Sequence, residues 1–248
     1  MNARYVVGVD DSPASRTALR WARERATAQS LACVRVHVRG TGSAVPADET
    51  LPEGPVAEAL AACARPGDVL VVGTDKTGFI HGRVFGSLGI QVTALAVARV
   101  AVIPDVDTRF RSGVVVGICH HDAAVAVATA GADEAARFGG MLQLVQAVAP
   151  QAASTAQRVD SAVAVGELAV RERHPGLEVQ VRIVTRPPAE ALLDAARNAR
   201  LLVLGPGRVW GPERTAPGRV LHDVLVNANA PVLVVRDARA VPVDAGTP

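Results

Sequence analysis

Short apolar runs alternate with longer amphipathic segments along the first part of the chain. Four valine-rich runs predict buried β-strands: residues 5–10, 31–38, 68–73 and 100–103. Three segments between them carry apolar side chains at helical spacing: residues 14–29, 56–64 and 87–96. Strands that alternate with helices predict a mostly parallel sheet with right-handed crossovers.

The rest of the chain repeats this pattern. Gly117 corresponds to Gly8, and both glycines stand near the end of an apolar run. Gly205 corresponds to Gly73, and the number of residues between these two is larger than between Gly8 and Gly117. The same larger offset relates the apolar run at 100–103 to VLVV at 232–235. A spacing that stays constant from the third strand to the last strand of the repeat predicts two homologous domains.

The two repeats differ in length between these anchors. The second contains a helical segment at 154–173 and an apolar strand at 177–185, where the first has only a polar, glycine- and proline-rich loop at 40–55. We therefore predict an α/β fold of two repeated domains, each a mostly parallel, five-stranded-type sheet with flanking helices. The first domain is shortened by one helix and one strand.

Polar segments mark the expected boundaries. The sequence DVDTRFR at 105–111 separates two apolar strands and is the natural linker. The prediction is a first domain at 1–104, this linker, a second domain at 112–237 and a flexible tail at 238–248.

Composition narrows the function classes. Of the 248 residues, 49% are hydrophobic but only 3% are aromatic, which suits a sheet of aliphatic residues covered by helices. A net charge of +2, without arginines interleaved with aromatics, disfavours a nucleic-acid partner. With neither a signal-peptide pattern nor an apolar run of membrane-spanning length, we expect a cytoplasmic protein with no membrane partner.

A glycine-rich loop follows the third predicted strand. Its glycines are Gly73, Gly78, Gly82 and Gly86. Ser87 comes next and begins a predicted helix, whose amino end could hold an anion. Ligands of open parallel sheets bind outside the carboxyl ends of the strands, where Asp10 and Val38 also fall. Asp10 alone would fit a simpler function as a helix N-cap.

These motifs together resemble the universal stress protein family. That family shows a strand ending V-D-x-S, then G-x2-G-x9-G-(S/T), and a last strand led by a small residue and proline. This chain has Val9-Asp10-Asp11-Ser12, the thirteen-residue step from Gly73 to Gly86, and Ala230-Pro231 before its last strand. The resemblance extends over nearly the whole chain except the loop at 40–55.

The resemblance implies a ligand and the residues that hold it. In ATP-binding members the matching residues place Asp10 and Val38 against the adenosine, and Gly73, Gly86 and Ser87 against the phosphates. The implied cofactor is ATP or a related adenine nucleotide, with or without Mg²⁺. The family fold, of adenine nucleotide α-hydrolase type, also implies that the last strands of the two domains pack as a pseudo-dimer. A further homodimer of the tandem is compatible with it.

Both repeats depart from the family pattern. Lys76, the one lysine of the chain, stands where the family has its second glycine, and is either a phosphate contact or a surface residue. In the second repeat Cys119 replaces Asp10, Pro206 removes a backbone N–H from the loop, and Arg219 replaces the hydroxyl residue. We expect no nucleotide in the second domain.

Other residue types with chemical potential have simpler explanations. His120-His121-Asp122 lacks a third ligand at metal-binding spacing, so a turn and helix cap is favoured. Cys119 fits a buried apolar cysteine better than a redox thiol.

With no catalytic group identified, we expect a nucleotide-responsive regulatory protein of the stress response that hydrolyses ATP slowly at most. Two alternatives remain. One is an interaction or scaffold module with unknown protein partners, in which both sites are degenerate. The other is an adenylating enzyme, which should carry a pyrophosphate-loop signature that Asp10-Asp11-Ser12-Pro13 does not match.

Overall fold

A computed structural model describes residues 3–38, 54–75, 88–119, 121–148, 156–207 and 217–236, with the backbone alone at 121–122 and 156–161. Its strands are β1 (Arg4–Gly8), β2 (Ala32–Val36), β3 (Val69–Thr74), β4 (Arg99–Pro104), β5 (Val114–Gly117), β6 (Leu142–Val148), β7 (Val179–Thr185), β8 (Leu201–Leu204) and β9 (Val232–Val234). Its helices are α1 (Pro13–Ala28), α2 (Val56–Cys63), α3 (Leu88–Leu95), α4 (His121–Phe138), α5 (Ala156–Arg173), α6 (Pro188–Ala196) and α7 (Arg219–Val226).

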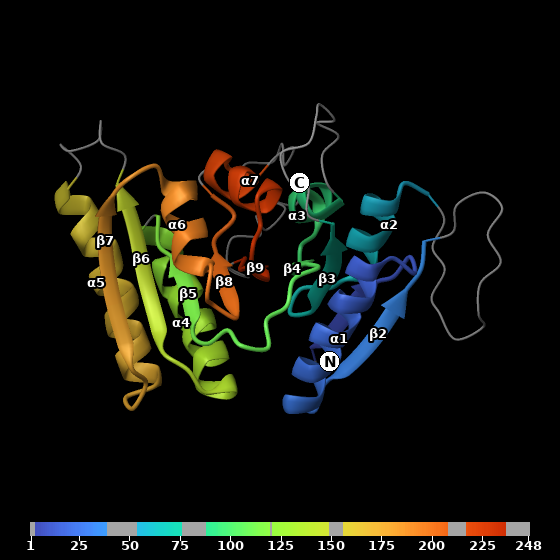
Figure 1. Cartoon of the computed structure of the whole chain (residues 1–248), viewed down its shortest axis with the longest axis horizontal. Coiled ribbons are helices and arrows are strands. Elements are labelled where there is room, and N and C mark those ends of the chain that lie inside the picture. The colour runs from blue at the N-terminus through green and yellow to red at the C-terminus, as the bar shows by residue number, and fades with distance from the viewer. Residues whose placement is uncertain are drawn as a thin grey trace, which may run out of the picture.

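The described strands form one continuous sheet in the order β2-β1-β3-β4-β9-β8-β5-β6-β7 (Figure 1). Strands β1 to β4, the first repeat, pair in parallel, and so do β5 to β9, the second repeat. The repeats meet where β4 pairs antiparallel with β9, in the register Val100↔Val234 and Val102↔Val232.

Strand order shows what the first repeat lacks. The second repeat has its edge strand β7 outside β6, whereas β2, the counterpart of β6, is itself the edge of the sheet. The helix α5 and the strand β7 have no counterpart among the described residues of the first repeat. The predicted fold class, with a first domain shorter by one helix and one strand, is therefore confirmed. The exact division into 1–104, 105–111 and 112–237 stays a prediction.

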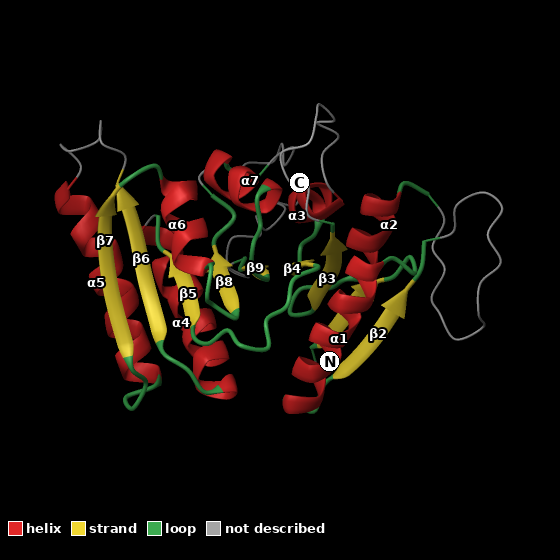
Figure 2. Ribbon diagram, viewed as in Figure 1, coloured by secondary structure: helices red, strands yellow, loops and turns green. Residues whose placement is uncertain are grey.

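Helices cover both faces of the sheet (Figure 2). On one face α2, α3, α6 and α7 pack over a core that includes Val6, Leu70 and Val100. On the other, α1, α4 and α5 cover alternate residues of the same strands, such as Val7 and Val71. Since side chains of a strand alternate between faces, a strand buried on both sides reads as a continuous apolar run. This is why the sequence pattern identified the strands.

Equivalent hydrogen bonds mark the repeat in three dimensions. Beyond the end of β1, the N–H of Val9 donates to the carbonyl of Val36 at 2.9 Å. Beyond β5, the N–H of Ile118 donates to the carbonyl of Val145 at the same distance. The second pair follows the first at the spacing that relates Gly117 to Gly8, so the repeat seen in the sequence corresponds to the same backbone geometry.

A buried ion pair joins the repeats on the face covered by α1 and α4. Arg25 Nε lies 3.0 Å from Glu134 Oε2, and the two side chains are 7% and 8% exposed. The Arg25 guanidinium also lies 3.8 Å from the ring centre of Trp21 and 4.6 Å from that of Phe138. Because Glu134 is the counterpart of Arg25 in the second repeat, equivalent positions of the two repeats face each other with opposite charges.

None of the helices among the described residues has the length and apolar character that crossing a membrane requires.

Candidate functional site

Three predicted site residues lie at the carboxyl edge of the first repeat's strands. The register Gly8↔Val36 between β1 and β2 places Asp10 and Val38 each two residues past the last pair. Gly73 lies near the carboxyl end of β3, which pairs with β1 on its other side. The structure thus brings Asp10, Val38 and Gly73 to one edge of the sheet, and we call these three residues the carboxyl-edge site.

The turn after β1 holds the Asp10 carboxylate in place. Asp11 adopts a left-handed backbone, with φ of 62°. Ser12 is the N-cap of α1, because its side-chain oxygen accepts the N–H of Ser15 at 3.1 Å. Asp10 Oδ1 accepts the N–H of Ser12, also at 3.1 Å. The simple N-cap interpretation of Asp10 is therefore wrong: its neighbour caps the helix, and Asp10 braces the turn that leads into it.

The Asp10 side chain is exposed and anionic at neutral pH. Partial burial favours the neutral form, but hydrogen bonds from Ser12 and Ser15 outweigh it and hold the pKa of Asp10 below its usual value. A carboxylate accepts several hydrogen bonds, and Ser12 uses only part of this capacity. The remaining capacity faces solvent, where it suits a ligand with hydroxyl groups.

Val38 supplies an apolar surface at the same edge of the sheet as Asp10. It is partly buried and packs against the core beneath α2 and α3. An anchored, partly exposed aliphatic side chain is a suitable contact for the flat face of a ligand ring.

Gly73 has a packing reason for lacking a side chain. A Cβ built there would lie 2.4 Å from the carbonyl carbon of Ala14 and 2.7 Å from the nitrogen of Ser15. The first turn of α1 therefore rests directly on β3. Gly73 thus brings the amino end of α1 to the carboxyl-edge site, and its expected phosphate contact stays a prediction.

The expected phosphate side of the site lies outside the described residues. This holds for Lys76, Gly86 and Ser87. The structure resumes at Leu88, where α3 begins, directly after Ser87 in the chain.

In the second repeat the position of Asp10 is taken by Cys119. The expectation that this cysteine is buried is wrong for its surface exposure, since Cys119 is exposed just beyond β5. Desolvation nevertheless raises the pKa of its thiol, which disfavours a reactive thiolate as expected. His120 and the side chains of His121 and Asp122 lie outside the described part of the chain, although both latter residues belong to α4. Across the described residues no group of three His, Cys, Asp or Glu side chains could hold a metal ion.

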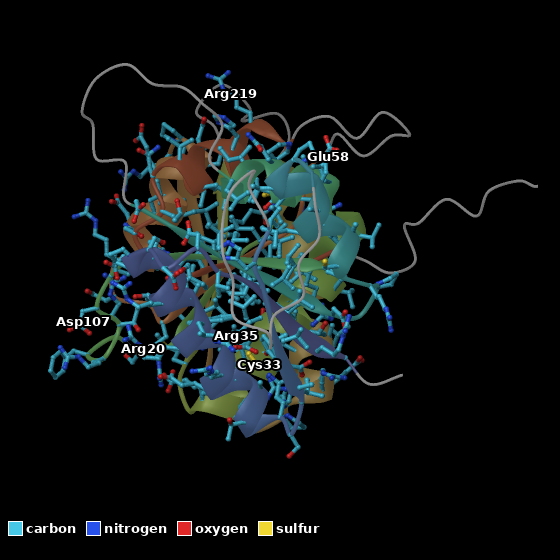
Figure 3. All side chains as sticks on the ribbon, turned by 90° about the vertical axis from the view of Figure 1, so that its right-hand side faces the viewer. Arg20, Cys33, Arg35, Glu58, Asp107 and Arg219 are labelled. Carbon is cyan, nitrogen blue, oxygen red and sulfur yellow. The ribbon has the colours of Figure 1, made fainter. Side chains whose placement is uncertain are left out.

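The glycine loop of the second repeat is closed at its base. Gly218, the N-cap of α7, donates its N–H to the carbonyl of Pro206 at 3.2 Å. Gly207 has a φ of +90°, and a Cβ there would lie 2.9 Å from Gly218 Cα. The first amide at this helix end is thus already used. The Arg219 side chain extends outward and is 95% exposed (Figure 3).

Sequence reasoning missed the residues that position Asp10. Ser12 was visible within the V-D-x-S motif, and its spacing before a helix is a capping signal. Thr17 and Asp105 left no such signal. The Thr17 hydroxyl donates to Asp105 Oδ1 at 2.8 Å, while the Asp105 N–H donates to the Thr74 carbonyl at 3.3 Å. Asp105, expected in a linker, ties α1 to the end of β3.

Comparisons with known proteins agree with this architecture. The model of the Universal stress protein family matches residues 112–236. "Universal stress protein Rv2623" of Mycobacterium tuberculosis is 25% identical over 285 residues, covering 94% of this chain and 96% of the relative. The crystal structure of a universal stress protein from Archaeoglobus fulgidus DSM 4304 superposes with a TM-score of 0.68 at 16% identity, covering 94% of this chain and 98% of that one.

A shorter solved structure is the universal stress protein from Archaeoglobus fulgidus in complex with dAMP. It has a TM-score of 0.42 at 22% identity, and covers 51% of this chain and 98% of that chain. The family match extends over half of this chain, and it confirms the resemblance drawn from the motifs. The chain therefore belongs to the universal stress protein family.

Proposed function

We propose that this protein is a cytoplasmic, nucleotide-responsive stress protein that binds ATP or a related adenine nucleotide at the carboxyl-edge site. The observation that carries the proposal is the ionised, exposed carboxylate of Asp10, braced by Ser12 and placed at the same sheet edge as Val38. Ligands of parallel sheets bind at this edge, and membership of the family supports an adenine nucleotide.

In this proposal the described residues act by binding and orientation. Asp10 accepts hydrogen bonds from the ribose hydroxyls, and Val38 contacts the adenosine. Gly73 lets α1 approach closely enough to hold Asp10 in position. Lys76, Gly86 and Ser87 are the proposed phosphate contacts, with Mg²⁺ as an optional companion of the phosphates.

Binding would act on the protein through its stability and its contacts. A ligand that binds only the folded state stabilises it in proportion to the logarithm of its concentration over Kd. The antiparallel pairing of β4 with β9 places the two repeats in one sheet, which supports a pseudo-dimer that responds as a unit. Further assembly into a homodimer of the tandem remains part of the proposal.

One nucleotide per chain is the expected stoichiometry. In the second repeat Cys119 cannot replace the carboxylate, and the Gly218 N–H is already bonded to Pro206. Neither group is therefore available to a nucleotide in the way that Asp10 is.

An alternative function is a scaffold module that binds protein partners and no nucleotide. The specific observation that favours it is the edge position of β2 among the described strands, since the described residues of the first repeat contain no counterpart of the helix and strand that extend the second.

Calorimetric titration with ATP, together with thermal unfolding, separates the two functions. We expect saturable binding in the wild type and a rise in melting temperature. Asp10→Ala should weaken binding by about tenfold or more, because hydrogen bonds to a charged group contribute about 1.5–3 kcal/mol. Gly86→Arg should weaken it further. Cys119→Ala, at the equivalent position of the second repeat, is the matched control and should bind as the wild type does.

Identical melting curves with and without excess ATP would establish the scaffold function instead. Equal loss of binding in Asp10→Ala and Cys119→Ala would contradict the assignment of the site to the first repeat.

A further inference from the structure

A cavity of about 110 Å³ lies away from the carboxyl-edge site, between the two repeats. The first repeat contributes the beginnings of β1, β3 and β4 and part of α1, while α4 and β9 contribute the opposite wall. Its polar lining includes Arg4, Tyr5, Gln29, Arg99 and Arg137. Since one water needs about 10–15 Å³ of accessible volume, the cavity has room for roughly seven to eleven water-sized groups.

The carboxylates of this lining are already neutralised. Asp133 Oδ1 lies 2.6 Å from Arg173 Nε and 2.8 Å from His174 Nε2. Glu134 is shared between Arg25 and Arg137, each at 3.0 Å. Both acidic groups are therefore held by cations, and neither is left to repel an anion.

One arginine of the lining, unlike the carboxylates, is not neutralised by an ion pair among the described residues. Arg4 is paired with Asp68 at 2.7 Å. Arg99, at the start of β4, is exposed and has no hydrogen-bond or ion-pair partner among the described residues. Its guanidinium offers five N–H donors in a planar arrangement that matches a carboxylate or a phosphate.

Two more donors in the lining lack an acceptor. Tyr5 Oη accepts the Gln29 side-chain N–H at 2.6 Å, so the hydroxyl hydrogen of Tyr5 is still free to donate. Burial raises the pKa of Tyr5, which keeps this hydrogen in place at neutral pH. The indole N–H of Trp21, which also lines the cavity, is buried without a partner in the described part of the chain. The Tyr5 hydroxyl and the Trp21 indole thus add two donors to the lining beside Arg99.

The equivalent position of the second repeat is filled. There a cavity of only about 10 Å³ lies at the beginnings of β5 and β8. Phe138, which stands where the first repeat has Gln29, lines it and lies 4.6 Å below the Arg25 guanidinium. Pro231 stands where the first repeat has Arg99. One of two equivalent spaces has thus been packed with an aromatic ring, while the other is open and carries an arginine that pairs with none of the described residues.

We propose that the open cavity binds a small oxyanion, a carboxylate or a phosphate, with the Arg99 guanidinium as its charged partner and the Tyr5 hydroxyl as a second donor. Because its walls come from both repeats, an occupant bridges them and stabilises their association. This binding is independent of the nucleotide at the carboxyl-edge site.

Calorimetric titrations with succinate and with inorganic phosphate, at constant ionic strength set by sodium chloride, test the proposal and identify the anion class. We expect saturable binding of at least one anion, with one molecule per chain. Arg99→Gln should weaken it by about tenfold or more, and Tyr5→Phe by a few-fold, since an ionic hydrogen bond is roughly twice as strong as a neutral one. Arg109→Gln is the control, because Arg109 is an exposed linker arginine that does not line the cavity.

The proposal is overturned if neither anion binds saturably, or if Arg99→Gln binds as tightly as the wild type. Asp10→Ala should retain anion binding in full, so a failure of nucleotide binding does not imitate a failure here. Thermal unfolding of Arg99→Gln without anion should match the wild type, because the removed side chain is exposed.

Discussion

The two repeats share a backbone plan but use it differently at the carboxyl edge of their strands. The first places the ionised side chain of Asp10 there, and the second places Cys119, whose thiol pKa is raised by desolvation. At the third strand Gly73 is pressed against the first turn of α1, whereas a Cβ at Gly205 would lie no closer than 3.4 Å to Val127. Two sites descended from one plan have therefore separated into a braced acceptor site and one without an acceptor.

The contrast extends to the opposite ends of the same strands. The first repeat ties the start of β1 to β3 through Arg4 and Asp68, while the second has Gly113 and Arg200 at the equivalent positions. The larger cavity lies between the repeats, at the beginnings of the first repeat's strands, and the smaller one lies at the beginnings of β5 and β8. The two copies of the fold thus differ at both ends of their strands.

The largest expected effect comes from the ion pair at which the repeats meet. Glu134→Ala should lower the free energy of unfolding by about 3–5 kcal/mol, because it leaves the Arg25 guanidinium buried without its partner. Urea unfolding measures this loss. The double variant Arg25→Glu/Glu134→Arg should recover a large part of the stability that Arg25→Glu loses.

Glu167→Ala is the matched control for Glu134→Ala. It removes an exposed pair within α5, to Arg171, which should contribute about 0.5 kcal/mol or less. A loss in Glu134→Ala as small as this would mean that the repeats do not depend on their buried ion pair.

A smaller effect on stability is expected when the equivalent glycines Gly73 and Gly205 are each replaced by alanine. Gly73→Ala should destabilise the protein by about 1–3 kcal/mol, because its methyl group overlaps the backbone of α1. Gly205→Ala should change stability by less than about 0.5 kcal/mol, since its methyl group meets only ordinary contacts. Unfolding curves of the two variants give the difference directly, and equal losses would show that α1 and α4 pack alike on the sheet.

The smallest expected effect is on the free energy of unfolding at acidic pH. Burial favours the neutral form of Asp68, but the hydrogen bonds from Arg4 and Arg65 outweigh it and lower the pKa of Asp68 from 3.8. A carboxyl whose pKa is lower in the folded state stabilises the protein above its unfolded pKa, and loses this contribution as the pH falls through the folded value. Asp68→Asn should therefore cost about 1 kcal/mol at pH 7 and progressively less below about pH 4.

Unfolding free energies measured from pH 7 down to pH 2 follow this change. Parallel pH profiles of the wild type and Asp68→Asn would contradict the assigned ionic contact between Asp68 and Arg4.

Much of the fold was predictable because it depends on local periodicity and on repetition. Apolar runs at 68–73 and 100–103 became β3 and β4, buried on both faces. The larger offset between Gly73 and Gly205 than between Gly8 and Gly117 predicted an extra helix and strand in the second repeat. The structure contains them as α5 and β7. Of the candidate site, Asp10 and Val38 were found by their positions after strands, since the carboxyl ends of parallel strands share one edge.

The sequence by itself determined the strands, the helices, the duplication and the edge at which Asp10 lies. Only the tertiary structure decided that Gly73 serves the packing of α1, that Cys119 is exposed and that Arg25 meets Glu134. The physical reason is distance along the chain. Periodic patterns record which face of an element is buried, but a contact between residues of different repeats depends on how whole helices settle on the sheet.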